Sequence, residues 1–268
     1  MIKDLNEVYT KEKIISQLHE MNIPQNKVVL MHSSLRLIGK TENGAQTVLD
    51  AMIEYFTADG GLFCVPTHTW ANLKNEITLD MSDTKTCLGA FSDFAVTDPR
   101  GIRSQNPTHS MMVFGDRDRA LEFIKDENDI ISGTDPKSCY GKLYRDGGYV
   151  LLVGVSHNRN TYIHCVDEML DMKDRLSEKI YDTSVKLASG EIIRQKIRPH
   201  ISGTSLRFPK YEVAFRYHGA ITDGFIGNAP TQCCDARIMK EVIERIYNNS
   251  GKINLIADES PLLPKWYV

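Results

Sequence analysis

The chain has 268 residues, of which 41% are hydrophobic and 25% charged, and its formal net charge at pH 7 is −3. These values are typical of a globular protein, and the lack of any linker predicts one domain over residues 1–268. A slightly acidic chain without a basic block does not favour nucleic acid as a partner. No apolar run reaches the ~20 residues that cross a bilayer, and the N-terminus has no signal-peptide core, so we expect a cytoplasmic protein that binds no membrane.

The six cysteines are scattered through the chain. None of them shows the CxxC or Cys-His spacing of a zinc site, so we expect reduced thiols and no metal cofactor. Cys165 stands beside a candidate catalytic histidine, His164, but adjacent positions of a helix point about 100° apart. A thiol nucleophile is therefore disfavoured.

The first third of the chain predicts a helix, a strand and a second helix. Helical periodicity over 10–21 ends at Asn22-Ile23-Pro24, a strand over 27–31 follows, and an amphipathic helix is predicted over 45–56. The loop of small residues between strand and second helix can bind an anion, because free backbone N–H groups and the helix dipole favour a phosphate or an oxyanion. It lacks the GxxxxGK[ST] and GxGxxG patterns, so an ordinary strand-to-helix turn is an equal alternative.

Polar residues also follow the second strand, LFCVP, where Thr67-His68-Thr69-Trp70 begins. The next segment, 71–83, is polar and aperiodic, which suggests a mobile flap. A short helix from Gly89, a strand over 111–115 and a helix over 118–125 continue the alternation of strands and helices.

A central strand is predicted at 149–155, where the apolar run is short, β-branched and bounded by glycines. The following helix should have Thr161 as its N-cap. His164, Asp167 and Glu168 then share one helix face beyond the end of a strand, which is where ligands bind in open α/β sheets.

The remaining segments complete the fold prediction. Residues 181–185 and 191–198 flank Ala188-Ser189-Gly190 as a hairpin, and an amphipathic helix covers 235–248. The alternation of strands and helices predicts an α/β fold with a mostly parallel central sheet flanked by helices. A smaller antiparallel β element is expected in the C-terminal third.

His164 is the candidate general base. A carboxylate bonded to one ring nitrogen would fix the tautomer and leave the other nitrogen to accept a proton, while a helix N-terminus opposes protonation of the ring. Two alternatives stay open: His164, Asp167 and Glu168 could ligate a metal ion as in a metal-dependent hydrolase, or form a solvated helix face. A serine nucleophile is rejected, because Asn158 replaces the last glycine of the GxSxG pattern.

His32, His68 and His109 each stand next to the end of a strand. They could line one cleft at the edge of the sheet. For each of them, an ordinary structural role is the alternative.

Six motifs in order resemble the aminoglycoside 3-N-acetyltransferase family, which is unrelated in fold to the GNAT acetyltransferases. They are HSSLRLIG followed by NGAQTVLDAM, VPTHTW, RSxxPxxS (Arg103, Ser104, Pro107, Ser110), SCYGKL, YVLLVGV followed by NTYIHxxD, and GxIGNA. The resemblance spans about residues 28–243. It implies transfer of an acetyl group from acetyl-CoA to a small amine, and it leaves a homodimer as an open alternative.

The resemblance also assigns residues. The family's catalytic histidine falls on His164 and its carboxylate on Asp167, where the family usually has glutamate, so Glu168 is a second candidate partner. The implied coenzyme-binding residues are His32, Ser33, Ser34, Leu35, Arg36, Lys40, Gly44 and Ala45, with Ser110 from the RSxxPxxS motif. Loop N–H groups or the Thr69 hydroxyl would stabilise the oxyanion, at roughly 3–4 kcal/mol per donor. Direct transfer without an acyl-enzyme fits these roles.

The resemblance defines the acceptor amine less closely than the reaction. The chain departs from the family's usual residues at Asn106, Cys139, Asp83-Thr84 and Val96. An aminoglycoside is a polycation and needs a carboxylate-lined cleft. The candidate substrate-binding residues are His68, Glu76, Asp80 and Asp93. We expect acetylation of the 3-amino group of an aminoglycoside, as in antibiotic resistance, with another amine as the alternative.

Overall fold

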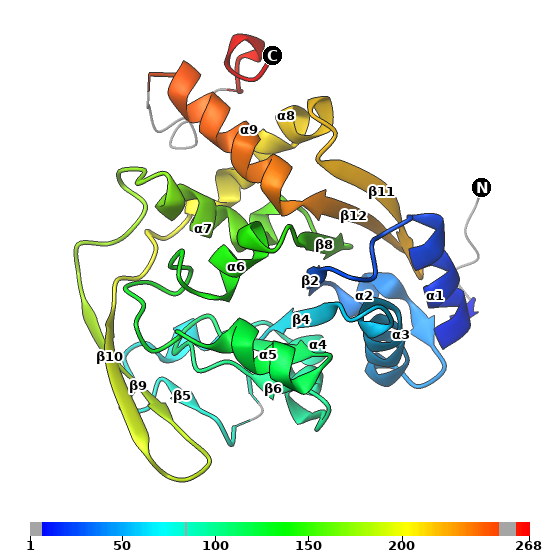
Figure 1. Cartoon of the computed structure of the whole chain (residues 1–268), viewed down its shortest axis with the longest axis horizontal. Helices are drawn as coiled ribbons and strands as arrows, with labels where there is room; N and C mark the ends of the chain where they lie inside the picture. The colour runs from blue at the N-terminus through cyan, green and yellow to red at the C-terminus, as the bar shows by residue number, and fades with distance from the viewer. Residues whose placement is uncertain (1–6, 84, 252–260) are drawn as a thin grey trace.

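The computed structural model describes residues 7–83, 85–251 and 261–268, and in this part of the chain a seven-stranded sheet forms the centre of the molecule (Figure 1). Its strands lie in the order β11 (Ile221–Ile226), β12 (Ala229–Asp235), β8 (Tyr149–Val153), β2 (Val28–Ser33), β4 (Leu62–Pro66), β7 (Met111–Phe114) and β6 (Ile102–Arg103). The neighbours β8, β2 and β4 are parallel, whereas the pairs on either side of them are antiparallel. The α/β class with a parallel centre is confirmed, but the antiparallel pairs that flank this centre were not predicted.

Both faces of the central strands are buried. In β2, Val28 and Leu30 belong to one hydrophobic core, whereas Val29 and Met31 belong to the other. Successive side chains of a strand point to opposite faces, so a strand covered on both sides needs an unbroken apolar run. Each buried Val or Leu contributes about 1.5–3 kcal/mol, which is why such runs specify the centre of the sheet.

Helices cover each face of the sheet (Figure 1). One core is closed by α1 (Lys11–Glu20), α3 (Ala45–Thr57) and α4 (Ala90–Thr97), and the other by α5 (Arg117–Ile124), α6 (Cys139–Arg145), α7 (Tyr162–Met169), α8 (Glu212–Tyr217) and α9 (Ala236–Asn249). In α9, the buried residues Met239, Val242, Ile243 and Ile246 recur at helical spacing, as an amphipathic helix requires. No helix in the described part of the chain is long and apolar enough to span a membrane.

Several short elements connect or flank the main helices and strands. They are β1 (Val8–Tyr9), paired with β3 (Lys40–Thr41), α2 (Leu35–Ile38), η1 (Trp70–Asn72), η2 (His157–Arg159), η3 (Thr204–Tyr211) and η4 (Pro264–Trp266). Three of them, α2, η1 and η2, directly follow β2, β4 and β8 in the sequence. Because the carboxyl ends of parallel strands meet at one edge of a sheet, these three segments form the rim of the candidate site.

A hairpin of β9 (Tyr181–Lys186) and β10 (Ile192–Ile197) projects from one end of the molecule (Figure 1). It confirms the antiparallel element expected in the C-terminal third. The strand β5 (Leu79–Asp80) pairs in parallel with β9, and the buried residue Thr78 donates its backbone N–H to the carbonyl of Ser184. The segment 71–83, expected to be an aperiodic flap, therefore contains a strand that is fastened to the hairpin.

Candidate active site

His164 lies in the first turn of α7, at the edge of the sheet where the parallel strands end. Its neighbours in this turn, Tyr162, Ile163, Cys165 and Val166, are buried in the core. His164 itself is only partly buried, because the other faces of the helix take up the packing. Thr161 stands at the N-cap position of α7 as predicted, but its backbone is helical, with φ −62° and ψ −24°, and its side chain makes no capping hydrogen bond.

The ring of His164 is packed between aromatic side chains. It stacks on His200, with centroids 4.1 Å apart and planes inclined by 21°, and meets the edge of Phe208 at 4.7 Å. Burial holds the pKa of His164 well below its ordinary value, and the charges of His200, His109 and Arg175 lower it further. The imidazole is therefore neutral at pH 7 and free to accept a proton.

Glu168 contacts the second histidine of this stack. Its Oε1 lies 3.0 Å from His200 Nε2 and accepts a hydrogen bond from the Thr134 hydroxyl at 2.6 Å. The hydroxyl of Ser132 donates to the other carboxylate oxygen. Glu168 thus holds His200, and His200 in turn supports the ring of His164. Nothing in the sequence pointed to His200, which stands in a loop of ordinary composition after β10.

Asp167 has a different partner. Its carboxylate is fully buried and lies 2.7 Å from the guanidinium Nε of Arg175. Burial raises the pKa of Asp167 to about 6, while Arg175 opposes that rise. Within the described residues, His164 Nδ1 has no hydrogen-bond partner. The expected bond from Asp167 or Glu168 to His164 is therefore not formed, because the two carboxylates are held by Arg175 and by His200.

His164 opens into a cavity of about 210 Å³, which we call the catalytic cavity. Its lining consists of His32, His68, Trp70, Leu88, His109, Asn158, Arg159, Asn160, Thr161, His164 and Ser205. The structure thus brings together His32, His68, His109 and His164, which the sequence placed near strand ends. Sequence reasoning missed the polar loop 158–160, although it directly follows a central strand. Ser205 comes from η3 and carried no sequence signal.

The histidine of the VPTHTW motif is held in place by two other motifs. Tyr140 of SCYGKL makes a hydrogen bond of 2.7 Å with His68 Nε2. Arg103 and Ser110 of RSxxPxxS both donate to the carbonyl of Thr67, at 3.0 and 2.8 Å. These buried bonds fix the loop after β4, and so they fix the position of the His68 ring.

Two residues with predicted roles make other contacts in this structure. Ser110 is fully buried behind Thr67 and lines neither the catalytic cavity nor the groove beside it, so it is not placed to bind a coenzyme. The hydroxyl of Thr69 donates to the carbonyl of Pro107 at 2.7 Å, and its side chain is 4% exposed. Thr69 is thus already committed and is not free to stabilise an oxyanion.

A groove of about 570 Å³ adjoins the catalytic cavity. We call it the coenzyme groove, after the coenzyme-binding residues that the resemblance implies at 32–36. Its lining consists of Met31, His32, Ser33, Ser34, Leu35, Arg36, Pro66, Trp70, Cys87, Leu88, Gly89, Ala90, Phe91, Ser92, Val155 and Arg159. His32, Trp70, Leu88 and Arg159 line both spaces, so the two are continuous. Five of the predicted coenzyme residues, 32–36, lie here as expected. Lys40, Gly44 and Ala45 do not, because the chain turns away from the groove after α2.

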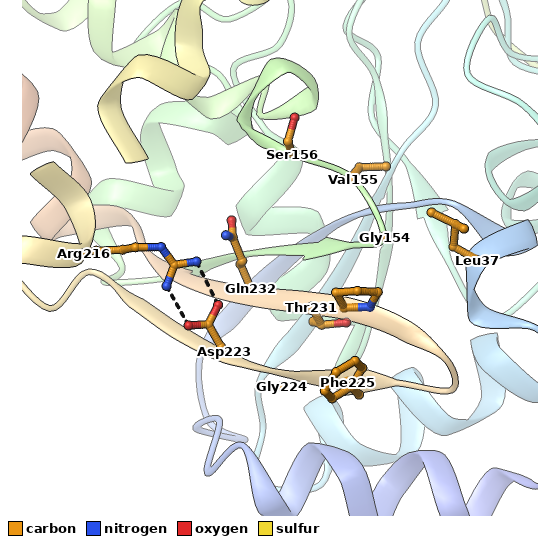
Figure 2. A pocket seen from close by; sticks show the side chains of 11 residues that line it. Leu37, Gly154, Val155, Ser156, Arg216, Asp223, Gly224, Phe225, Thr231 and Gln232 are labelled. Carbon is orange, nitrogen blue, oxygen red and sulfur yellow. Dashed lines mark hydrogen bonds and ion pairs between the residues drawn. The ribbon is translucent and has the colours of Figure 1, made fainter. Parts of the chain in front are cut away.

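A third cavity, of about 660 Å³, lies beside the hairpin β11–β12 (Figure 2). Val155 lines both this cavity and the coenzyme groove. Figure 2 shows its charged side chains, Arg216 and Asp223, facing one another across paired hydrogen bonds of 2.6 and 3.0 Å. None of the described residues that line it is a histidine, so His164 stays the candidate base.

The acidic residues expected to bind a polycation lie elsewhere. Glu76 lines a separate cavity at the β9–β10 hairpin, together with residues of both strands. Asp80 is paired with Lys186 at 2.9 Å, and Asp93 accepts the backbone N–H of Thr86 at 2.7 Å. Neither the catalytic cavity nor the coenzyme groove is lined by any of them. The expected carboxylate-lined cleft is therefore not formed by these residues.

Comparison with known proteins decides the family. Residues 30–248 match the sequence model of the aminoglycoside 3-N-acetyltransferases, which is more than half of the chain. The chain belongs to this acetyltransferase family. The family predicted from the six motifs is thereby confirmed.

Curated relatives within the family are distant. The aminoglycoside N(3')-acetyltransferase-like protein YokD of Bacillus subtilis is 25% identical over 178 residues, which cover 59% of this chain and 64% of that protein. An aminoglycoside N(3)-acetyltransferase IV of Salmonella is 27% identical over 162 residues, covering 60% of this chain and 59% of that protein. The chain thus matches about three fifths of the length of these relatives.

Solved structures of the acetyltransferase family share the fold. Aminoglycoside acetyltransferase AAC(3)-IVa, in a complex with gentamicin, superposes with a TM-score of 0.80 at 21% identity, over 97% of this chain and 95% of that one. The enzyme AAC-IIIb, in a binary complex with CoASH, gives a TM-score of 0.74 at 19% identity, over 88% and 94%. The fold of this chain is therefore that of the family, outside the GNAT class.

The last family motif, GxIGNA, supports the coenzyme groove from behind. Its Asn228 donates its backbone N–H to the carbonyl of Ile38 at 2.9 Å and binds the Tyr9 hydroxyl with its side chain at 2.8 Å. Gly227 has φ +57°, and an added Cβ would lie 2.3 Å from the Ile38 carbonyl oxygen. The motif thus fixes the end of the loop whose residues 32–36 line the groove.

Proposed function

We propose that this chain transfers the acetyl group of acetyl-CoA to the amino group of an acceptor, with His164 as the general base. The observation that carries the proposal is a neutral imidazole that opens into a cavity continuous with a groove lined by residues 32–36. When bound, acetyl-CoA would supply the thioester carbonyl that the amine attacks. Membership of the acetyltransferase family supports the same reaction.

The residues of the coenzyme groove fit a ligand with phosphate groups. Arg36 lines the groove as a cation, and guanidinium groups bind phosphates through paired hydrogen bonds. Ser33, Ser34 and Leu35 would hold the pantetheine arm of the coenzyme, which joins its phosphates to the thioester. Because the groove and the catalytic cavity share a wall, a ligand held in the groove can bring one end to His164.

His164 would act on the acceptor in a single displacement. As the amine nitrogen forms the new C–N bond, the C–S bond of the thioester breaks and the amine proton passes to His164. That proton can then neutralise the departing thiolate, so no acyl-enzyme is needed. General base catalysis of this kind contributes typically ~10²–10⁴ in rate. The stack on His200 would keep the imidazole in the orientation for this transfer.

The relatives' names supply the first acceptors to test. Relatives within the family are called aminoglycoside N(3)-acetyltransferase III and IV. On this basis the 3-amino group of an aminoglycoside is the acceptor that the family suggests, with resistance by modification as the biological outcome. An amine of another class is the alternative.

A thiol-release assay tests the proposal. Purified protein is mixed with acetyl-CoA and aminoglycosides that carry or lack a 3-amino group, alongside unrelated amines, and free coenzyme thiol is measured. We expect amine-dependent release that His164→Ala lowers by at least about a hundredfold while the affinity for acetyl-CoA is kept. Turnover that persists in His164→Ala would refute the role of His164. Loss of activity on chelator treatment would instead support the metal-dependent hydrolase.

A further inference from the structure

The charge of the catalytic cavity narrows the acceptor, provided that the proposed acetyl transfer is correct. Within the described residues no aspartate or glutamate lines the cavity, and Arg159 is the one permanently charged side chain in its wall. Burial lowers the pKa of His32, His68, His109 and His164, so these rings are neutral at pH 7. The lining therefore carries net positive charge.

The carboxylates that follow His164 in the sequence do not offset this charge. Asp167 faces Arg175, and Glu168 is held by His200 together with two hydroxyl groups. Neither lines the cavity. An acceptor that enters beside His164 would thus meet a cationic wall and neutral polar groups.

The guanidinium of Arg159 is available to a ligand. It makes no hydrogen bond or ion pair with the side chains that the structure describes, and it is exposed on the wall shared by cavity and groove. It lines both spaces together with the buried His32, whose pKa is lowered first by burial and further by the charge of Arg159. A free guanidinium presents its N–H donors in a planar fork that matches a carboxylate or a phosphate.

The coenzyme's own phosphates are poorly placed to use Arg159 during the reaction. The pantetheine arm, with its two amide units, separates the thioester from the diphosphate, whereas the catalytic cavity has a volume of only about 210 Å³. With the thioester beside His164, the phosphates would lie farther along the coenzyme groove, toward Arg36. Arg159 is left for a group close to the reacting atoms.

We propose that the acceptor is an amine that also carries an anionic group, a carboxylate or a phosphate, and that Arg159 binds this group. The anion would anchor the acceptor while its amino group faces His164. A polycationic aminoglycoside would instead place several positive charges beside an unpaired guanidinium, with no carboxylate in the wall to offset them. Like charges repel one another, although water at the exposed Arg159 screens part of this repulsion.

Matched pairs of amines test this preference. Thiol release is measured with glucosamine 6-phosphate against glucosamine, with glycine against glycinamide, and with gentamicin as the polycation. Each pair presents a primary amine with and without the anion, and the two pairs separate phosphate from carboxylate. Because the anion also changes the basicity of the amino group, kcat/KM is compared per unprotonated amine. We expect kcat/KM for the anionic member of at least one pair to exceed that of its neutral twin by about tenfold or more, as a charge-assisted bond supplies.

Variants locate the effect at Arg159. In Arg159→Gln the ratio of kcat/KM between the anionic acceptor and its neutral twin should fall to about one, through a higher KM for the anionic member. Arg159→Glu should reverse the preference and raise kcat/KM for gentamicin. Arg194 is exposed on β10 of the β9–β10 hairpin, so Arg194→Gln is the matched control and should change none of these values. Calorimetric binding of each twin to the protein with CoA bound gives a readout that does not need turnover.

Several outcomes would overturn the inference and leave the proposed function standing. These are equal kcat/KM for both members of each pair, the highest kcat/KM for gentamicin, or an equal loss of kcat with every acceptor in Arg159→Gln. The last result would place Arg159 at the thioester instead. If no amine in the panel releases thiol and none binds to the CoA complex, the proposed function and this inference fail together.

Discussion

The imidazole rings of His164 and His200 lie almost parallel, with centroids 4.1 Å apart, and the carboxylate of Glu168 lies 3.0 Å from the far side of the pair, at His200 Nε2. Glu168, four positions after the candidate base in the sequence, thus contacts the second histidine of the stack and not His164 itself. This relationship makes the pH dependence of the reaction a test of the site.

Replacement of His200 should move the acid limb of the pH profile. A base works only when neutral, and the pKa of His164 is lowered first by burial and then by the charge of His200. In His200→Gln the second contribution is gone, so the pKa of His164 rises and activity is lost at a higher pH than in the wild type. A rise of one unit would lower the neutral fraction about tenfold on the acid side. The measurement is kcat/KM for acetyl transfer between pH 5 and 9. His19→Gln, on the exposed face of α1, should keep the wild-type profile, and an unmoved limb in His200→Gln would contradict the coupling.

Glu168→Gln should reduce turnover without loosening the coenzyme. The amide can still accept from the Thr134 hydroxyl, but it lacks the negative charge that strengthens the hydrogen bond with His200. We expect kcat to fall by about tenfold, within the range of a lost charge-assisted hydrogen bond, while the KM for acetyl-CoA and the thermal midpoint change little. Steady-state kinetics and thermal unfolding decide this. A variant that keeps full kcat would show that Glu168 only fills space beside His200.

Asp167→Asn should act on stability more than on catalysis. The change leaves the buried guanidinium of Arg175 without its counter-charge, which costs about 3–5 kcal/mol in comparable buried pairs. Urea unfolding gives the free energy of unfolding. The double variant Asp167→Leu with Arg175→Met removes both charges and should recover most of the loss. If Asp167→Asn instead kept its stability and lost activity by orders of magnitude, the direct role first expected for Asp167 would be restored.

The sequence identified the elements that carry the site better than it identified the contacts within it. Apolar runs such as 28–31 and 149–153 specify buried strands, and the residues at their ends meet because parallel strands bring those ends together. In this way the sequence located His32, His68 and His164. The flanking antiparallel strands β11 and β12 were missed, because a run such as ITDGFI is short and only half buried.

Side-chain partners were harder to predict because they depend on residues distant in the sequence. Asp167 and Glu168 are equally near His164 along the helix, so helical geometry could not separate them. Their partners are Arg175, in the loop after α7, and His200, 32 positions beyond Glu168. Likewise, the hydroxyl of Thr69 was expected to stabilise the oxyanion, but it donates its hydrogen bond to the carbonyl of Pro107.

Gly227→Ala should weaken coenzyme binding from outside the groove. The new Cβ would approach the Ile38 carbonyl to 2.3 Å, in a left-handed conformation that only glycine adopts without strain. We expect the loop over 32–38 to shift, with a severalfold higher KM for acetyl-CoA and a loss of about 1–3 kcal/mol in stability. Gly190→Ala in the hairpin arm is the control, because its φ is +88° but open space surrounds its Cβ. It should share the backbone strain and leave the KM unchanged. Equal KM values in the two variants would show that GxIGNA does not support the groove.

Cys87 offers a direct test of where the coenzyme lies. Its side chain is partly exposed and lines the coenzyme groove, whereas the other five cysteines are buried. Burial raises the pKa of its thiol, which also donates to the carbonyl of His68 at 3.1 Å, so labelling by a maleimide at pH 7 should be slow but selective. Saturating CoA should slow this labelling by about tenfold or more, since a bound ligand that covers a site reduces reaction in proportion to its occupancy. Mass spectrometry of the labelled peptide gives the rate, and Cys87→Ser should abolish the adduct. Labelling that proceeds at the same rate with and without CoA would place the coenzyme outside this groove.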